Sequence, residues 1–236
     1  MTWRQRSIWY VNPLQFAPGE DLDKYPRDPA WDESVCAEEG VSALLLLRDD
    51  EMYPRGFGTK VLPTVAMDRY EAASRPDHFA GVATVVTKLF NIVRPHRSYF
   101  GLKDYQQVQV VRRIAEDLHL GVEVVSAQTE REPDGLAMSS RNVHLSQAER
   151  MNAPLLHQAL QEVQATYTSG ERSAAEALRR GRTVLDAADV PMTLDYFDAV
   201  DPATLDKVGE LRDGVVVLAA IRLASARLID NIVLDG

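Results

Sequence analysis

The sequence predicts an α/β protein in which a parallel-sheet domain is followed by a small α+β domain. Two patterns predict this fold. Up to residue 128, short apolar runs alternate with amphipathic stretches, which is typical of βα units on a parallel sheet. After residue 142, two helical patterns are followed by three strand patterns, which favours a separate α+β unit. We place the domain boundary between residues 129 and 130.

The first elements follow from apolar runs and from helix start and stop signals. Residues 8–11 and the continuous apolar run 43–47 are expected to be strands, and the second run suits a strand buried in a parallel sheet. Between them, Asp28 and Pro29 predict a helix start, because Asp caps free amides and proline fits the first helical position. Gly40 predicts the end of that helix.

The next segments continue the alternation of helix and strand. Residues 84–93 are expected to be helical, 98–100 to form a short strand, 103–118 a helix and 121–126 the next strand. In the helix 103–118, the spacing places Val111, Ile114 and Leu118 on one apolar face.

A polar connector at 129–142 interrupts this pattern before the second domain. Ser146 and Glu149 form a capping-box sequence that predicts a helix start. Helices near 147–168 and 171–187 and strands near 193–200, 214–221 and 227–234 complete the chain.

Composition excludes several classes of protein. The formal net charge of -9 argues against a nucleic-acid binder, although local cations can still bind a small anion. The single cysteine, Cys36, excludes an internal disulfide framework and a Cys-rich zinc site, and the histidines form no pair at metal-ligand spacing. No apolar run is long enough to cross a bilayer, and residues 8–11 are too short for a signal peptide, so we expect a cytoplasmic protein.

The segment 99–107 is the most informative for chemistry, because a strand and a glycine turn lead into a helix there. A Lys at a helix N-terminus is unfavourable unless an anion is present, so Lys103 with the free amides predicts a phosphate site. Gln107 lies one turn later and faces a similar direction, where it could orient a substrate. On the pattern alone, an ordinary solvated first turn explains these residues equally well.

Two other segments carry weaker signals. In 134–142, Ser139, Ser140 and Arg141 offer the short donors that a polyphosphate needs, although a plain linker has a similar composition. Asn12 and Gln15 follow the first strand at the sheet edge where ligands bind in open α/β folds, and a turn stabilised by Asn-Pro is the alternative.

Together these segments resemble the pantothenate synthetase (pantoate–β-alanine ligase) family. The matching segments occur in the family's order: Val-Asn-Pro-Leu-Gln-Phe (11–16), Glu-Asp-Leu-Asp-Lys-Tyr-Pro-Arg (20–27), Glu-Met-Tyr-Pro (51–54), His-Phe-Ala-Gly-Val-Ala-Thr-Val-Val (78–86), Tyr-Phe-Gly-Leu-Lys-Asp-Tyr-Gln-Gln (99–107), Asp-Gly-Leu-Ala-Met-Ser-Ser-Arg-Asn (134–142) and Arg-Leu-Ile-Asp-Asn-Ile (227–232). A single match would be weak, whereas an ordered series across the chain makes chance resemblance very improbable.

The resemblance implies an ATP- and Mg²⁺-dependent ligase that acts in two steps. Pantoate carboxylate attacks the α-phosphate of ATP to give pantoyl adenylate and pyrophosphate, and the amine of β-alanine then displaces AMP. It implies a Rossmann-like nucleotide- and pantoate-binding domain over 1–129, a C-terminal α+β lid over 130–236, and a homodimer. No membrane or nucleic-acid partner is implied.

The resemblance also implies roles for individual residues. Lys103 would neutralise the α-phosphate, and Ser139, Ser140 and Arg141 would hold the β- and γ-phosphates, with Lys103, Ser139 and Arg141 as the catalytic residues. The remaining contacts would be Phe100, Gly101 and Asp104 to the nucleoside, Met138 to the adenine region, and Asn12, Gln15 and Gln107 to pantoate. No metal ligand is assigned.

One departure from the family pattern is large. The family begins with a strand and a Met-Gly-x-Leu-His-x-Gly-His segment whose histidines bind ATP phosphates, and this segment does not occur in the sequence. We therefore expect an N-terminally truncated, incomplete Rossmann-like domain without its first βα unit, whose neighbouring strands have unpaired edges. A mis-assigned start codon would explain the pattern equally well.

Three functional hypotheses follow. The chain is a working ligase, or a catalytically impaired homologue that binds a ligand or partner, or an amide ligase for other substrates on the same scaffold.

Overall fold

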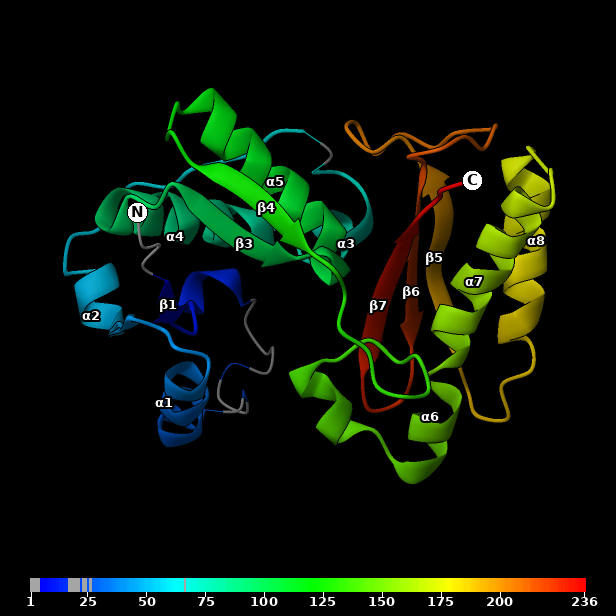
Figure 1. Cartoon of the computed structure of the whole chain (residues 1–236), viewed down its shortest axis with the longest axis horizontal. Helices are drawn as coiled ribbons and strands as arrows, with labels where there is room; N and C mark the ends of the chain where they lie inside the picture. The colour runs from blue at the N-terminus through cyan, green and yellow to red at the C-terminus, as the bar shows by residue number, and fades with distance from the viewer. Residues whose placement is uncertain (1–4, 17–21, 23–24, 26, 66) are drawn as a thin grey trace.

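The computed structural model describes residues 5–16, 22, 25, 27–65 and 67–236. The chain forms two lobes side by side, and the segment after β4 crosses from one to the other (Figure 1). The predicted fold class is confirmed, because parallel strand pairs build the first lobe and an antiparallel sheet builds the second. Most of the segment 20–27, which carries part of the family resemblance, lies outside the described residues.

The first lobe contains two parallel strand pairs. Strand β1 (Arg6–Trp9) pairs with β2 (Ala43–Leu46), and β3 (Arg97–Gly101) pairs with β4 (Glu123–Ala127). Within the described residues, no strand ladder joins one pair to the other. The four strands lie where the sequence predicts them, with bounds that differ by one or two residues at most ends.

The helices of this lobe follow their local signals. Helix α1 (Pro29–Glu38) begins as predicted, with the Asp28 carboxylate accepting a hydrogen bond from the Trp31 amide at 3.1 Å. Gly40 follows its end with a φ of 70°, a left-handed conformation that glycine adopts without strain. The short helices α2 (Asp49–Met52) and α3 (Tyr70–Ser74) were not expected from the sequence.

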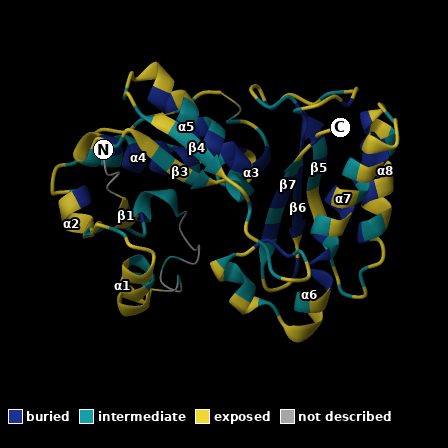
Figure 2. Cartoon of the chain, viewed as in Figure 1, coloured by how far each residue is buried: buried dark blue, intermediate teal, exposed yellow. Residues whose placement is uncertain are grey.

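Helices α4 (His78–Val93) and α5 (Tyr105–Asp117) enclose the core of the first lobe. Phe79 and Val82 of α4 pack with Val111 and Ile114 of α5, and all four are buried. Figure 2 shows dark, buried segments on both helices. The expectation for Leu118 was wrong, because it lies just beyond α5 and is 46% exposed. The predicted helix start at residue 103 was also wrong, because 102–104 form a separate 3-10 turn, η3 (Leu102–Asp104).

The second lobe is an antiparallel sheet with helices packed on one face. Strands β5 (Thr193–Val200), β6 (Val216–Arg222) and β7 (Arg227–Val233) lie in the order β5-β6-β7, and α7 (Leu155–Thr168) and α8 (Ala174–Leu185) cover them (Figure 1). The predicted helix 147–168 is divided into α6 (Gln147–Asn152) and α7, because Pro154 has no N–H to continue the hydrogen-bond ladder.

Gly181 allows α8 to approach α7 and the sheet closely. A Cβ at this position would lie 2.7 Å from the Phe197 ring and 2.8 Å from the Ala159 carbonyl oxygen. We expect Gly181→Ala to lower the free energy of unfolding by about 1–3 kcal/mol, because the added methyl overpacks a buried contact. Urea unfolding should detect this loss. The matched variant Gly58→Ala, whose Cβ would meet nothing closer than 3.8 Å, should unfold like the wild type.

The capping box at the start of α6 forms as predicted and also joins α6 to the sheet. Ser146 Oγ accepts from the Glu149 amide, and the Glu149 carboxylate accepts from the Ser146 amide at 2.9 Å. The same carboxylate accepts from the amide of Ser225 at 2.9 Å and from its hydroxyl at 2.7 Å. The hydrogen bonds from Ser225, followed by those from Ser146, lower the pKa of Glu149 from 4.5 to about 2.

This depressed pKa predicts a pH-dependent contribution to stability. A carboxyl whose pKa falls on folding stabilises the native state above its unfolded pKa, and this contribution is lost as pH falls through the folded value. We expect Glu149→Gln to lower the free energy of unfolding at neutral pH, and the deficit to shrink between pH 4.5 and about 2. Urea titrations across that range measure it. Glu116→Gln, on the exposed face of α5, is the control. A loss of unfolding free energy in Glu149→Gln that does not vary with pH, or that Glu116→Gln shows equally, would contradict the stabilising role of ionised Glu149.

No helix in the described part of the chain has the length and apolar character needed to cross a membrane.

Candidate active site

A cleft of 560 Å³ lies where the two lobes meet. Its walls come from α3, the start of α4, the turn η3 with the start of α5, the loop 136–144 and strand β7. Within the described residues, its charged lining comprises Arg75, Lys103, Arg141, Arg222 and Arg227 against Glu71, Asp104 and Asp230. The cleft is therefore locally cationic in a chain of net charge -9, which suits an anionic substrate.

Lys103 projects into this cleft from η3. Its ammonium lies 3.4 Å from an Asp104 carboxylate oxygen, and its side chain is 20% exposed. Asp104 precedes the first residue of α5, and its own side chain does not cap that N-terminus. The N-terminus of α5 therefore adjoins the ammonium of Lys103, and both carry the positive charge expected of an anion site.

The loop 136–144 forms the opposite wall. Ser139 caps the 3-10 turn η4 (Ser140–His144), and its Oγ accepts from the Arg141 amide at 3.3 Å. Asn142 donates to the Ala137 carbonyl at 3.1 Å, which folds the loop back on itself. Ser139 and Arg141 line the cleft, whereas Ser140 is exposed outside it.

The turn η1 (Pro13–Gln15) packs against the start of α4. Asn12 is buried, and its side chain accepts from the Tyr53 hydroxyl at 2.6 Å and donates to the Gly81 carbonyl at 3.1 Å and to Gln15 Oε1 at 3.3 Å. Arg75 donates to the Gln15 carbonyl at 3.1 Å, and His78 Nδ1 lies 2.9 Å from the same oxygen. These contacts fix the position of Gln15.

The structure brings some of the predicted site residues together and leaves others outside the cleft wall. The five that line it are Lys103, Asp104, Gln107, Ser139 and Arg141. The six that do not are Asn12, Gln15, Phe100, Gly101, Met138 and Ser140. Phe100 packs edge-to-face on Phe90 at 6.4 Å between ring centroids, and Met138 is half exposed.

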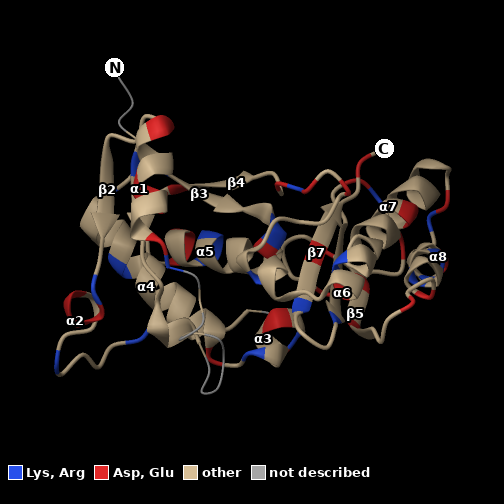
Figure 3. Cartoon of the chain, turned by 90° about the horizontal axis from the view of Figure 1, so that it is seen from below, with Lys and Arg blue, Asp and Glu red and all other residues tan. Residues whose placement is uncertain are grey.

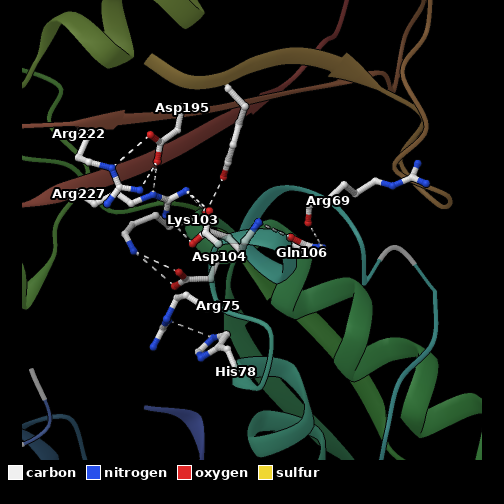
Figure 4. Close-up of polar contacts among 12 residues, drawn as sticks. Arg69, Arg75, His78, Lys103, Asp104, Gln106, Asp195, Arg222 and Arg227 are labelled. Carbon is white, nitrogen blue, oxygen red and sulfur yellow. Dashed lines mark hydrogen bonds and ion pairs between the residues drawn. The ribbon is translucent and has the colours of Figure 1, made fainter. Parts of the chain in front are cut away.

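A partly buried ion-pair cluster in the cleft wall joins the two lobes. Arg227 of β7 pairs with Glu71 of α3 at 2.7 Å and with Asp195 of β5 at 2.6 Å, and Arg222 also pairs with Asp195 (Figure 4). Tyr196 donates to Glu71 at 2.8 Å, and burial, followed by the charge of Glu71, raises the pKa of this tyrosine. Figure 3 shows the oppositely charged segments side by side where α3 meets the sheet.

Sequence reasoning missed this cluster. Its members lie up to 156 residues apart, and although Arg227 opens the matched segment 227–232, nothing in that segment indicates its partners. Arg75 and His78 were likewise overlooked as site residues, although the matched segment 78–86 begins at His78. Figure 4 shows Lys103 and Asp104 lying between the Arg227 cluster and the Arg75–His78 pair.

The fold and the cleft together define a two-lobed α/β protein with a cation-lined cleft between its lobes. Comparison with known proteins gives its family. The sequence profile of pantoate–β-alanine ligase matches residues 6–233. The chain therefore belongs to the pantoate–β-alanine ligase family.

Individual relatives agree with this assignment. The pantothenate synthetase of Chloroflexus aurantiacus is 47% identical over 230 residues, which cover 96% of this chain and 81% of that protein. The enzyme of Acidiphilium cryptum is 49% identical over 223 residues, covering 94% of this chain and 79% of that protein.

Solved structures agree in fold. The pantothenate synthetase of Thermus thermophilus superposes with a TM-score of 0.94 and 46% identity, over 98% of this chain and 83% of that one. The pantoate–β-alanine ligase of Francisella tularensis, solved with β,γ ATP and β-alanine, superposes with a TM-score of 0.76 and 27% identity, over 97% of this chain and 78% of that one.

Proposed function

We propose that this chain condenses pantoate and β-alanine to pantothenate, with cleavage of ATP to AMP and pyrophosphate. The observation that carries the proposal is the cation-lined cleft between the lobes, in a chain of this ligase family. Pantoate carboxylate displaces pyrophosphate from ATP to form pantoyl adenylate, and the amine of β-alanine then displaces AMP from the acyl carbon. Neither step needs a covalent intermediate on the protein, so positioning and charge neutralisation carry the catalysis.

The cleft supports phosphate-binding roles for three residues. Lys103 and the adjacent amides of α5 neutralise the α-phosphate, and Ser139 and Arg141 hold the outer phosphates from the opposite wall. Ser140 joins them if the loop 136–144 turns inward on ATP. Asp104 and the end of β3 at Phe100 and Gly101 contact the nucleoside, and half-exposed Met138 covers the adenine.

Gln107 and Gln15 bind pantoate in this proposal. Gln107 lines the cleft, and Gln15 lies outside that lining at the end of η1, where Arg75 and His78, which do line it, contact its carbonyl. Asn12 acts through Gln15, because its side-chain atoms are already bonded to Tyr53, Gly81 and Gln15 within the protein.

The donor set of the cleft fits a Mg²⁺ ion that enters with ATP. Among the described acidic residues that line it, Glu71 and Asp230 are bonded to arginines, whereas Asp104 has only the loose contact with Lys103. No group of three His, Cys, Asp or Glu suited to a metal occurs within the described ranges. Asp104 would therefore hold the ion together with phosphate oxygens and water, and Mg²⁺ would supply charge neutralisation.

The roles of the two domains are proposed from membership of the same ligase family. Residues 1–129 bind nucleotide and pantoate, and residues 130–236 form the lid. Two hydrophobic cores, one within residues 52–115 and one within residues 136–234, support this division, and a third buried cluster that includes Tyr105 and Leu218 joins the two lobes. Assembly as a homodimer and a cytoplasmic location stay predictions.

The test is formation of AMP and pantothenate by the purified chain with Mg-ATP, pantoate and β-alanine. Stoichiometric AMP and pantothenate support the ligase. Pantoate-dependent pyrophosphate release without β-alanine would isolate the adenylation step. A well-folded chain that forms neither product would reject the proposal and leave a ligand-binding homologue. Product formed only with another amine or acid would indicate an amide ligase for other substrates.

A further inference from the structure

Strand β7 contacts both phosphate-binding segments of the cleft through two adjacent side chains. Successive residues of a strand face opposite sides, so Asp230 and Asn231 point in opposite directions from the centre of β7. Asn231 reaches the turn that carries Lys103, in the other lobe. Asp230 reaches the base of the loop that carries Ser139 and Arg141.

The contact made by Asn231 is bidentate and buried. Its Nδ2 donates to the carbonyl of Leu102 and to the carbonyl of Lys103, each at 2.9 Å, and the residue is 5% exposed. Both hydrogen atoms of the amide are therefore used on consecutive carbonyls of η3. A 3-10 turn has few hydrogen bonds of its own, so an external anchor has a large effect on its position.

The contact made by Asp230 fixes the other segment. Arg131 donates to its two carboxylate oxygens at 2.7 and 3.1 Å and also donates to the Gly135 carbonyl at 3.1 Å. The carboxylate further accepts from the Asn231 amide at 2.8 Å, and its side chain is 2% exposed. The buried, bidentate geometry makes this a rigid connection.

We propose that Asn231 is a positioning residue of the ligase, which holds the Lys103 turn at a fixed separation from the Ser139–Arg141 loop. The inference rests on the proposed function, in which Lys103 and that loop bind phosphates of the same ATP molecule. Asn231 touches no reacting atom. It keeps Lys103 and the Ser139–Arg141 loop at the distance that binding one triphosphate requires. A shift of about 1 Å in such a group can lower the rate by 10²-fold.

The main test compares Asn231→Leu and Asn231→Asp with the wild type. Leucine keeps the volume but has no donor, and an ionised aspartate faces the two carbonyls with acceptors only. We expect kcat to fall by about 10–100-fold in both variants, with KM for β-alanine nearly unchanged, because β-alanine enters after the nucleotide is placed. Asn231→Gln retains the amide donors and should recover part of the lost kcat.

Asn152→Asp provides a matched control for stability. Asn152 is also a buried asparagine with side-chain bonds, to Ala148 and Asp189, but it does not line the cleft. Asn152→Asp should lower the melting temperature and leave kcat unchanged. If Asn231→Asp does the same, Asn231 is merely structural and the proposal is overturned.

A second measurement separates this inference from the proposed function. Amide hydrogen exchange of residues 101–107 needs no substrate, and we expect it to be about tenfold faster in Asn231→Leu, with α7 unchanged. Exchange in 101–107 of Asn231→Leu equal to that of the wild type would overturn the positioning role even in an active enzyme. If the wild-type chain forms no product but exchange in 101–107 is still faster in Asn231→Leu, Asn231 does hold the Lys103 turn. That result would reject only the proposed ligase activity.

Discussion

Lys103→Ala is expected to lower kcat/KM for pantothenate formation by about 10²–10³-fold, because one preorganised charge is lost where negative charge develops on the α-phosphate. Adenylation is the step that should slow, so pantoate-dependent pyrophosphate release should fall in parallel. Steady-state assays with Mg-ATP as the varied substrate measure the effect. The melting temperature should change little, because the contact of Lys103 with Asp104 is long, at 3.4 Å, and partly solvated.

Two further variants make this expectation specific. Lys103→Arg keeps the charge but changes its geometry, so it should retain part of the activity. Lys88→Ala removes a lysine that lies over the Phe57 ring at 4.9 Å, away from the cleft, and should retain full activity. Equal losses in Lys88→Ala and Lys103→Ala would show a nonspecific effect of charge, and unchanged activity in Lys103→Ala would refute its phosphate role.

Local signals account for the parts of the fold that the sequence predicted well. Asp28 with Gly40, and Ser146 with Glu149, fix helix ends through hydrogen bonds within a few residues, so the sequence alone contains all their partners. The strands of both lobes were predicted because a buried strand requires a continuous or alternating apolar run. The sequence predicted a parallel sheet in the first domain but not which strands pair, because the pairing partners lie far apart in the chain.

The errors occur where tertiary contacts override a local pattern. Lys103 was expected in the first helical turn, but Asn231 binds the carbonyls of Leu102 and Lys103 from the other lobe, and α5 begins only at Tyr105. Leu118 continues the apolar spacing of α5, yet the helix ends before it. Neither outcome is visible in the spacing of residues along one segment.

The site was predicted only in part for the same reason. Lys103, Gln107 and the Ser139–Arg141 loop carry recognisable chemistry in short motifs. Lys103, Gln107, Ser139 and Arg141 all line the cleft, whereas Ser140 does not. The residues that hold the motifs in place, such as Glu71 with Arg227, have meaning only as pairs across the lobes. No composition or periodicity in the sequence marks such a pair.

Gly81→Ala is expected to displace Gln15, which we propose contacts pantoate. Gly81 lies in the first turns of α4, where the backbone of η1 crosses it, so a Cβ would lie 2.7 Å from the Gln15 amide nitrogen and closer still to the Leu14 carbonyl. Both neighbours are backbone atoms, which cannot move aside as a side chain would. The turn must therefore shift away from α4, and it carries the Gln15 side chain and the Asn12 bond to the Gly81 carbonyl with it.

We expect this shift to lower kcat/KM for pantoate by about 10²-fold, because about 1 Å of displacement is enough to misplace a substrate-binding group. The free energy of unfolding should fall by about 1–3 kcal/mol, as for other overpacked sites. Kinetics with pantoate varied at saturating ATP, together with urea unfolding, measure the two effects separately. Gly209→Ala, whose Cβ would meet nothing within 4 Å, should match the wild type in both. A Gly81→Ala enzyme that lost stability but kept its kcat/KM for pantoate would show that Gln15 takes no part in binding it.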